Sequence, residues 1–248
     1  MTTTDQTHEK DVVAASGAAQ ARKPCPICGS DRFVAGPKGR MSPEGLPPRC
    51  AACGALERHR NYRALFNALR PLWHGRRALQ FSDDPSAPRD AFSSFEVSVY
   101  GGDNSLDLAD IDRADGAYDV VIANHVLEHV EDDMAALAEL DRISADRGTV
   151  FLSVPDLLRC KRTVEYGRAR EDKHGHYRIY GPDLMERVRE AAPLWRAVGV
   201  IGRDPVTGAP DIATVFTRDR DFAEAVKHHF GKVGLEPYNP LAQDAVEG

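Results

Sequence analysis

Four cysteines occur as two copies of one short pattern that is typical of a metal site. Cys25 and Cys28 form Cys-x-x-Cys-Gly, and Cys50 and Cys53 repeat it after a polar loop rich in Gly and Pro. Two such turns can present four thiolates to one tetrahedral Zn²⁺ ion, which leaves no position open for water or substrate. We therefore predict a structural zinc ribbon spanning residues 23–57. Free or redox-active cysteines are the alternative, although a redox motif would be expected only once.

A second group of chemically capable residues follows a short apolar run. The run, residues 118–123, is rich in β-branched side chains, as expected for a buried strand of a parallel sheet. Asn124, His125, Glu128 and His129 come directly after it. Because ligands bind at the carboxyl ends of strands in open α/β sheets, we expect a binding site here.

These residues also carry a resemblance to a known family. The phrase YDVVIANHVLEHV, the later run GTVFLSVP and the phrase HGHYRIYG resemble class I S-adenosylmethionine-dependent methyltransferases, in the branch with a general methyltransferase domain. The resemblance covers roughly residues 78–217 of the expected doubly wound fold and is specific between 119 and 155. It implies an α/β fold with a doubly wound, mostly parallel, Rossmann-like sheet, preceded by the zinc ribbon, and S-adenosylmethionine as cofactor.

The resemblance also implies which residues bind the cofactor. Asp103, after a strand and a Gly-Gly turn, would accept hydrogen bonds from both ribose hydroxyls. Asp107 matches the residue that holds the adenine amino group, although a turn or helix-cap role is the alternative for either Asp. The loop at 82–86 lacks the glycines usual in this family, so we expect a variant site. The full predicted set is Phe81, Ser82, Asp83, Asp103, Asp107, Leu108, Asn124, His125 and His129.

A long charged segment, residues 157–180, is predicted to be a lid over the substrate. Its phrase HGHYRIYG matches a family phrase of the form DH-x-R-x-YG, and the alternative is a solvated loop. We predict substrate contacts from His174, Tyr177, Arg178 and Tyr180. Methyl transfer from a sulfonium is an in-line displacement that can be assisted by a base, so His125 and His176 are the predicted catalytic residues. A structural, hydrogen-bonded histidine is the alternative for each.

These sites must be positioned by a regular order of elements. Residues 1–22 are expected to form a disordered leader, with a helical patch at 12–21 as an alternative. A linking helix within 58–75 should end or bend at Pro71, and its basic residues face either solvent or an anionic substrate. The methyltransferase domain would span 76–248. Within it we expect strands at 78–81, 95–100, 118–123, 149–154, 195–201 and 212–216 and helices at 131–143, 182–192 and 221–230.

The amino-acid composition indicates which kinds of partner the protein binds. The chain has 248 residues, 42% of them hydrophobic, a net charge of −6, and neither a membrane-length apolar run nor a secretory signal. We predict a cytoplasmic enzyme with a small-molecule acceptor, with no membrane or nucleic-acid partner and no indication of oligomeric state. The alternatives are a zinc-ribbon ribosomal or transfer RNA methyltransferase and a non-catalytic binding protein that keeps the fold.

Overall fold

The computed structural model describes residues 23–155, 157 and 160–241, so the predicted leader lies outside the described residues. A six-stranded sheet has the order β4-β3-β5-β6-β10-β9. The first four of these strands are parallel to one another, and β10 is antiparallel to both of its neighbours. The strand bounds are β3 Arg77–Phe81, β4 Ser94–Ser98, β5 Tyr118–Asn124, β6 Ser144–Ser153, β9 Arg196–Arg203 and β10 Pro210–Thr217. The predicted strands therefore all form.

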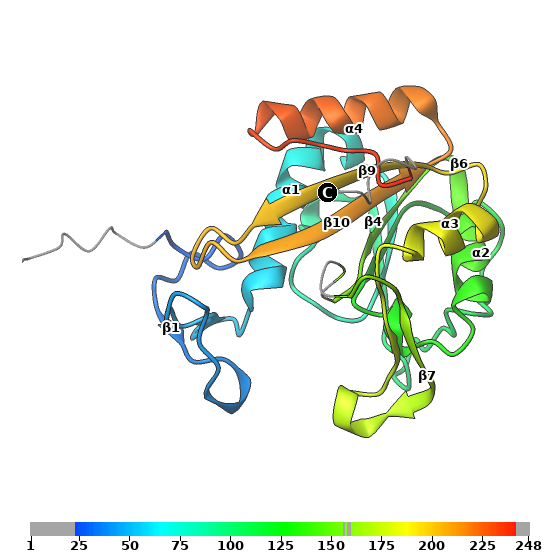
Figure 1. The fold of residues 1–248 in the computed structure, drawn as a ribbon. Coiled ribbons are helices and arrows are strands. Elements are labelled where there is room, and N and C mark those ends of the chain that lie inside the picture. Colours follow the sequence, from blue (N-terminus) through cyan, green and yellow to red (C-terminus); the bar gives the residue numbers. More distant parts are fainter. Residues whose placement is uncertain (1–22, 156, 158–159, 242–248) are drawn as a thin grey trace, which may run out of the picture.

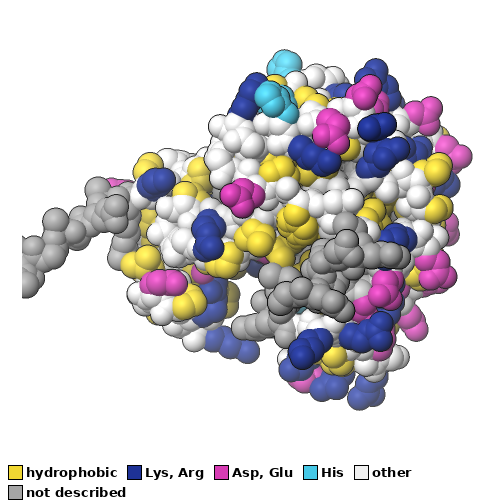
Figure 2. All heavy atoms as spheres, turned by 45° about the horizontal axis from the view of Figure 1, so that its top comes forward, with side chains coloured by type: hydrophobic (Ala, Val, Ile, Leu, Met, Phe, Trp, Pro, Cys, Tyr) yellow, Lys and Arg dark blue, Asp and Glu magenta, His cyan; other side chains and the backbone are white. Residues whose placement is uncertain are grey.

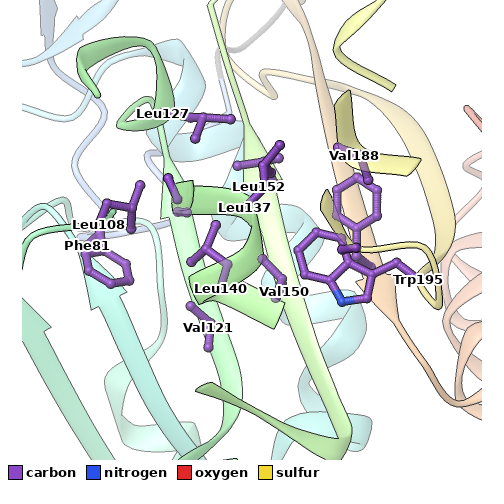
Figure 3. Packing of buried hydrophobic residues seen from close by; sticks show 14 of the residues in the cluster. Phe81, Leu108, Val121, Leu127, Leu137, Leu140, Val150, Leu152, Val188 and Trp195 are labelled. Atoms are coloured by element: carbon purple, nitrogen blue, oxygen red, sulfur yellow. The ribbon is translucent and has the colours of Figure 1, made fainter. Parts of the chain in front are cut away.

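Helices cover both faces of this sheet (Figure 1). One face packs on α1 (Glu57–Trp73) and α4 (Arg220–Lys232), and the other on α2 (Asp133–Ile143) and α3 (Leu184–Ala191). Alternate residues of β5 enter opposite cores: Val121 points to the α2 and α3 side, as Figure 3 shows, while Val120 points to the α1 and α4 side. A strand that is buried on both faces is apolar along its whole length, which explains the nearly continuous apolar sequence of β5.

The edge of the sheet at β3 and β4 departs from a fully doubly wound fold. Only a single turn, η2 (Arg89–Ala91), lies between these two strands, and the segment 99–117 between β4 and β5 holds no helix. Pro85 and Pro88 disfavour a helix in the first connection, and the second lacks helical periodicity. Leu106, Leu108 and Ile111 of the second connection pack into the core where a helix would otherwise lie.

The helix termini follow from local capping. The N-cap residues Asp132 of α2 and Asp219 of α4 accept hydrogen bonds from backbone N–H groups of the first helical turn. In α1, the N–H of Leu56 donates instead to the imidazole of His59. The helix also continues through Pro71 to Trp73, where we expected an end or a bend. Pro71 lacks the N–H for one intrahelical hydrogen bond, and because it lies in the last turn only two helical residues follow it.

Two small substructures lie at the end of the sheet where β5 ends (Figure 1). The N-terminal ribbon contains β1 (Phe33–Val34), η1 (Pro37–Gly39) and β2 (Arg49–Cys50). The predicted lid segment contains an antiparallel hairpin of β7 (Val164–Arg170) and β8 (His176–Ile179), joined through η4 (Glu171–Lys173). The hairpin packs on η3 (Leu127–His129), the turn that follows β5. No helix in the described part of the chain is long and apolar enough to span a bilayer.

Candidate functional site

The four predicted metal ligands come together in the ribbon. Their sulfur atoms lie within 4.8 Å of one another, with 3.8 Å between the sulfurs of Cys25 and Cys53 and 3.6 Å between those of Cys28 and Cys50. A tetrahedral ion with Zn–S bonds of about 2.3 Å requires sulfur separations of about 3.8 Å, so the four thiols fit a closed zinc site. Gly29 and Gly54 follow the two pairs with positive φ, which completes two equivalent turns.

The ribbon is attached to the sheet domain through a buried arginine. Arg60 of α1 is fully buried and donates two hydrogen bonds to Asp204, in the turn between β9 and β10. It also donates to the carbonyl oxygens of Pro48 and Ala55 in the ribbon. Arg60 therefore faces neither solvent nor an anionic substrate, the two environments expected from the sequence. Its guanidinium joins the ribbon, the linking helix and the sheet.

The loop after β3 is held in place by polar side chains where the family usually has glycines. Arg63 donates hydrogen bonds to three successive carbonyl oxygens, those of residues 85–87, and Gln80 donates to the carbonyls of Ser82 and Asp84. Ser82 has a φ of 70°, a conformation that favours glycine, and Asp83 is exposed and paired with Arg89. The loop thus turns sharply without a glycine.

The other predicted cofactor residues fall into two groups. Asp103 and Asp107 are exposed beyond the end of β4; the Asp107 carboxylate accepts the N–H of Ala109, and that of Asp103 makes no hydrogen bond or ion pair among the described residues. Phe81 and Leu108 are buried side by side in the core (Figure 3). A carboxylate free to accept hydrogen bonds at this strand end fits the ribose of an adenosyl group.

Asn124 and His125 lie at the end of β5, as predicted. The Asn124 side chain is buried between the hydroxyls of Ser86 and Ser153. The His125 Nε2 lies 3.1 Å from the hydroxyl of Tyr62, which donates its one proton to Asp211, so Nε2 must donate to Tyr62. Burial lowers the pKa of His125 to about 3, so the ring is neutral at pH 7 and its basic atom is Nδ1.

A cavity of about 310 Å³ lies between η3, the end of β6 and the hairpin. It is lined by Glu128, Pro155, Asp172, Lys173, His174, His176, Arg178, Ile179 and Tyr180. Three of the four predicted substrate contacts and the predicted catalytic His176 are therefore at its wall, whereas His125 and Tyr177 are not among the lining residues.

Two of these lining residues hold the hairpin in place. Arg178 is buried and donates to the carbonyl oxygens of Val130 and Glu131, at 2.5 and 2.6 Å, and to the carboxylate of Glu165. Tyr180 donates to Asp133 at 2.8 Å, and burial raises its pKa well above the ordinary value. Their polar atoms are thus occupied by the protein, while substrate contact by either residue stays a prediction.

Two lining residues of this cavity, Glu128 and His176, form a cluster with the neighbouring His129, with one ligand atom of each within 4.8 Å of the others. Burial raises the pKa of Glu128 to about 8. Burial also lowers the pKa of His129, and it lowers that of His176 to about 4, with His129 and His174 contributing to the latter shift. Both imidazoles are therefore neutral at pH 7. His129, predicted at the cofactor, is brought next to the predicted base His176.

Comparison with known proteins decides the family. A family model described as a methyltransferase domain matches residues 16–193, more than half of the chain. The chain belongs to the methyltransferase-domain family. This confirms the Rossmann-like fold and the prediction that the protein is an S-adenosylmethionine-dependent methyltransferase.

Solved structures of other methyltransferases are only distantly similar. One from Thermotoga maritima is 16% identical, with 65% of this methyltransferase and 91% of the other chain covered and a TM-score of 0.43. The 1,6-didemethyltoxoflavin-N1-methyltransferase of Burkholderia thailandensis, with bound 1,6-didemethyltoxoflavin and S-adenosylhomocysteine, is 14% identical. The match covers 64% of this methyltransferase and 76% of the other chain, with a TM-score of 0.46. One from Aquifex aeolicus is 11% identical, and the match covers 61% of this methyltransferase and 89% of the other chain, with a TM-score of 0.38. No curated protein sequence matches the chain. Similarities this low say nothing about the acceptor.

Several site residues of the methyltransferase were not predicted from sequence. Neither Tyr62 nor Asp211 was among the predicted site residues. The Tyr62 hydroxyl lies 3.1 Å from Nε2 of His125 and donates to Asp211, whose carboxylate is 4.0 Å from the same nitrogen. Glu128 was expected at the strand end but was given no substrate-binding or catalytic role, yet it lines the cavity. The available signal for Glu128 was a carboxylate and an imidazole enclosed by apolar residues in the phrase VLEHV.

Proposed function

We propose that this methyltransferase transfers the methyl group of S-adenosylmethionine to a small molecule bound in the cavity beside η3 and the hairpin. The observation that carries the proposal is the cavity itself, about 310 Å³, which is at the lower end of the range for small-molecule sites. Titratable and hydrogen-bonding groups converge on it, including His174, His176 and Lys173. Such a lining suits a compact polar acceptor.

Under this proposal, one group of residues binds the cofactor and another holds the acceptor in line with the methyl group. When bound, S-adenosylmethionine supplies an electrophilic methyl group on its sulfonium. Asp103 and Asp107 would hold the adenosine part, because their carboxylates lie at the carboxyl end of β4. The hairpin, fixed by Arg178, would cover the acceptor and exclude water, which an in-line displacement requires together with close alignment.

We also propose that Cys25, Cys28, Cys50 and Cys53 hold a structural Zn²⁺ ion. The sulfur separations support this, and four thiolates fill the coordination sphere. Under this proposal the ion stabilises the ribbon and takes no part in methyl transfer.

The net charge of the chain favours a small-molecule acceptor over an RNA acceptor. The chain carries a net charge of −6, which repels a phosphate backbone. Figure 2 shows Lys and Arg side chains gathered at the hairpin, but with acidic side chains among them. Exposed Arg168 and Lys173 alternate there with exposed Glu171 and Asp172. RNA binding that weakens steeply with salt would overturn this assignment.

Calorimetric titration with S-adenosylmethionine and S-adenosylhomocysteine tests the cofactor part. We expect both to bind, and we expect Asp103→Ala to weaken binding by roughly tenfold to a hundredfold, since hydrogen bonds to a charged group contribute about 1.5–3 kcal/mol. Asp112→Ala, at an exposed aspartate of the same connection, is the matched control and should bind normally. Absence of binding by either ligand would instead indicate a non-catalytic protein that keeps the fold.

A further inference from the structure

We propose that Glu128, His129 and His176 form a binding site for a divalent transition-metal ion at the wall of the cavity. Two of the residues come from η3 and the third from β8, so the site exists only in the folded chain. Their ligand atoms lie within 4.8 Å of one another, and Nε2 of His129 is 4.0 Å from a carboxylate oxygen of Glu128. Two imidazoles and one carboxylate are a ligand set of known Zn²⁺ and Fe²⁺ centres.

The strongest indication is the environment of Glu128. The residue is 1% exposed, and neither of its carboxylate oxygens has a hydrogen-bond partner among the described residues. Buried polar atoms are nearly always hydrogen-bonded, and one that is not calls for a ligand, an ion or a water. Glu128 also lines the cavity, so an ion there could reach its oxygens.

His129 is oriented as a metal-binding histidine usually is. A Cβ atom built on Gly175 would lie 3.7 Å from Nδ1 of His129, so Nδ1 faces the backbone of the hairpin while Nε2 faces Glu128. Metal-binding histidines typically use one ring nitrogen for the ion and the other for a backbone carbonyl or carboxylate. The rings of His129 and His176 are perpendicular, with centroids 4.7 Å apart, so the two imidazoles are in contact, and each has a ring nitrogen within 4.8 Å of a Glu128 oxygen.

The hairpin brings the third ligand into place. Arg178, two residues after His176, is fixed to the carbonyl oxygens of Val130 and Glu131, which directly follow η3. This contact sets β8 against the turn that carries the other two ligands. Because M–N and M–O bonds are about 2.0–2.2 Å, the ligand atoms would need to approach to about 3 Å from one another. This approach, up to about 1.8 Å for atoms 4.8 Å apart, is within the reach of side-chain rotation, since His129 is exposed and His176 is half-buried.

Three protein ligands leave coordination positions open, which is typical of catalytic rather than structural metal sites. The open positions would face the cavity, which Glu128 and His176 both line. Resting on the proposed function, we infer that the ion binds a hydroxyl oxygen of the acceptor and lowers its pKa, so that the proton passes to water. The oxygen then takes the methyl group from the sulfonium, and S-adenosylhomocysteine leaves as the neutral thioether. His176 would then be a metal ligand and not the general base predicted from the sequence.

Binding of Mn²⁺ to the full-length, zinc-loaded protein tests the site. Mn²⁺ prefers oxygen donors and binds thiolates more weakly than Zn²⁺ does, so it should leave a four-thiolate ribbon occupied by zinc. Titration followed by electron paramagnetic resonance should show one tightly bound Mn²⁺, with couplings to imidazole nitrogen. Glu128→Gln and His176→Gln should each weaken binding by more than the about 10–100-fold that follows loss of an outer-shell partner.

His174→Asn is the matched control, because His174 lines the same cavity and lies next to His176, but is not one of the three ligands. Asparagine tolerates the positive φ of this position, so the variant should fold and bind Mn²⁺ as the parent does. Absence of Mn²⁺ binding by the parent protein, equal binding by Glu128→Gln, or an equal loss in His174→Asn would each overturn the proposal.

Titration of the same variants with S-adenosylhomocysteine separates this inference from the proposed function. We expect the cofactor product to bind Glu128→Gln and the parent protein with affinities within about threefold, which is less than about 0.7 kcal/mol. Loss of Mn²⁺ binding with retained cofactor binding also shows that the variant is folded. Mn²⁺ binding without any cofactor binding would leave the metal site standing and remove the proposed function.

Discussion

Replacement of Arg60 by methionine should destabilise the protein far more than any exposed charge change. Arg60 is fully buried, and its guanidinium makes four hydrogen bonds: two to Asp204 and one each to the carbonyls of Pro48 and Ala55. Its charge is therefore matched by one buried carboxylate, also without exposure. Methionine keeps the unbranched apolar stem but leaves that carboxylate without its counter-ion.

The expected cost follows from the burial of both charges. Removal of one partner of a buried ion pair costs about 3–5 kcal/mol, since the other charge is left uncompensated. Asp204 keeps two hydrogen bonds from Thr207, which places the expectation at the lower end, about 3 kcal/mol. That is a large part of a total stability of about 5–15 kcal/mol for a typical domain.

Urea unfolding followed by tryptophan fluorescence is a direct assay. The two tryptophans, Trp73 and Trp195, are buried in the cores on opposite faces of the sheet, so they report on the sheet domain. Arg70→Met is the matched control: it lies on the same helix, and its ion pair with Asp90 is largely exposed. Exposed pairs contribute about 0–1 kcal/mol, so the control should lose little.

A second measurement uses the contacts of Arg60 with the ribbon. Because two of its hydrogen bonds end on ribbon carbonyls, Arg60→Met should release zinc to a chelator faster than Arg70→Met does. The reasoning is refuted if Arg60→Met costs no more free energy of unfolding than the control. If Arg60→Met lowers the free energy of unfolding strongly but does not release zinc faster, the ion pair with Asp204 alone accounts for the stabilisation by Arg60.

Two further predictions concern the ribbon and the loop after β3. Cys28→Ser should lower the zinc content well below the about one ion per chain expected of the parent and expose residues 25–53 to limited proteolysis; an unchanged zinc content would contradict the four-thiolate site. Ser82→Gly should raise the free energy of unfolding by about 1 kcal/mol, because a non-glycine residue at a φ of 70° is strained by about that amount; thermal unfolding measures this, and a lower melting temperature would contradict it.

Periodic patterns predicted most of the fold. The strand and helix at 118–143 have strong apolar patterns, and both form close to the expected bounds. The helices predicted from the sequence left both connections around β4 without a helix, and the structure agrees, although the resemblance implied a complete doubly wound template. What decided the outcome was local: prolines in one connection, and apolar residues such as Leu106 and Leu108 that pack without helical spacing in the other.

The site was predicted less completely because its contacts join distant parts of the chain. Arg60 and Asp204 are separated by 144 residues, and a charge on a helix normally indicates a solvated face. Glu128 was noticed as part of a phrase, but its position opposite His176 depends on how the hairpin folds back. The cysteine pairs were the exception, because their spacing alone specifies how four sulfur atoms meet.

The contacts of helix α1 determine whether the N-terminal ribbon can be removed without loss of stability. Arg60 on this helix reaches the ribbon, Arg63 holds the loop after β3, and Tyr62 contacts His125 at the end of β5. A shortened chain that begins at α1 would lack the carbonyl oxygens of Pro48 and Ala55, to which the Arg60 guanidinium donates hydrogen bonds. The guanidinium would keep its charge without these two acceptors. The cysteine-rich segment is therefore not a detachable accessory, and a relative that dispensed with it would also need a different residue at this position of the helix.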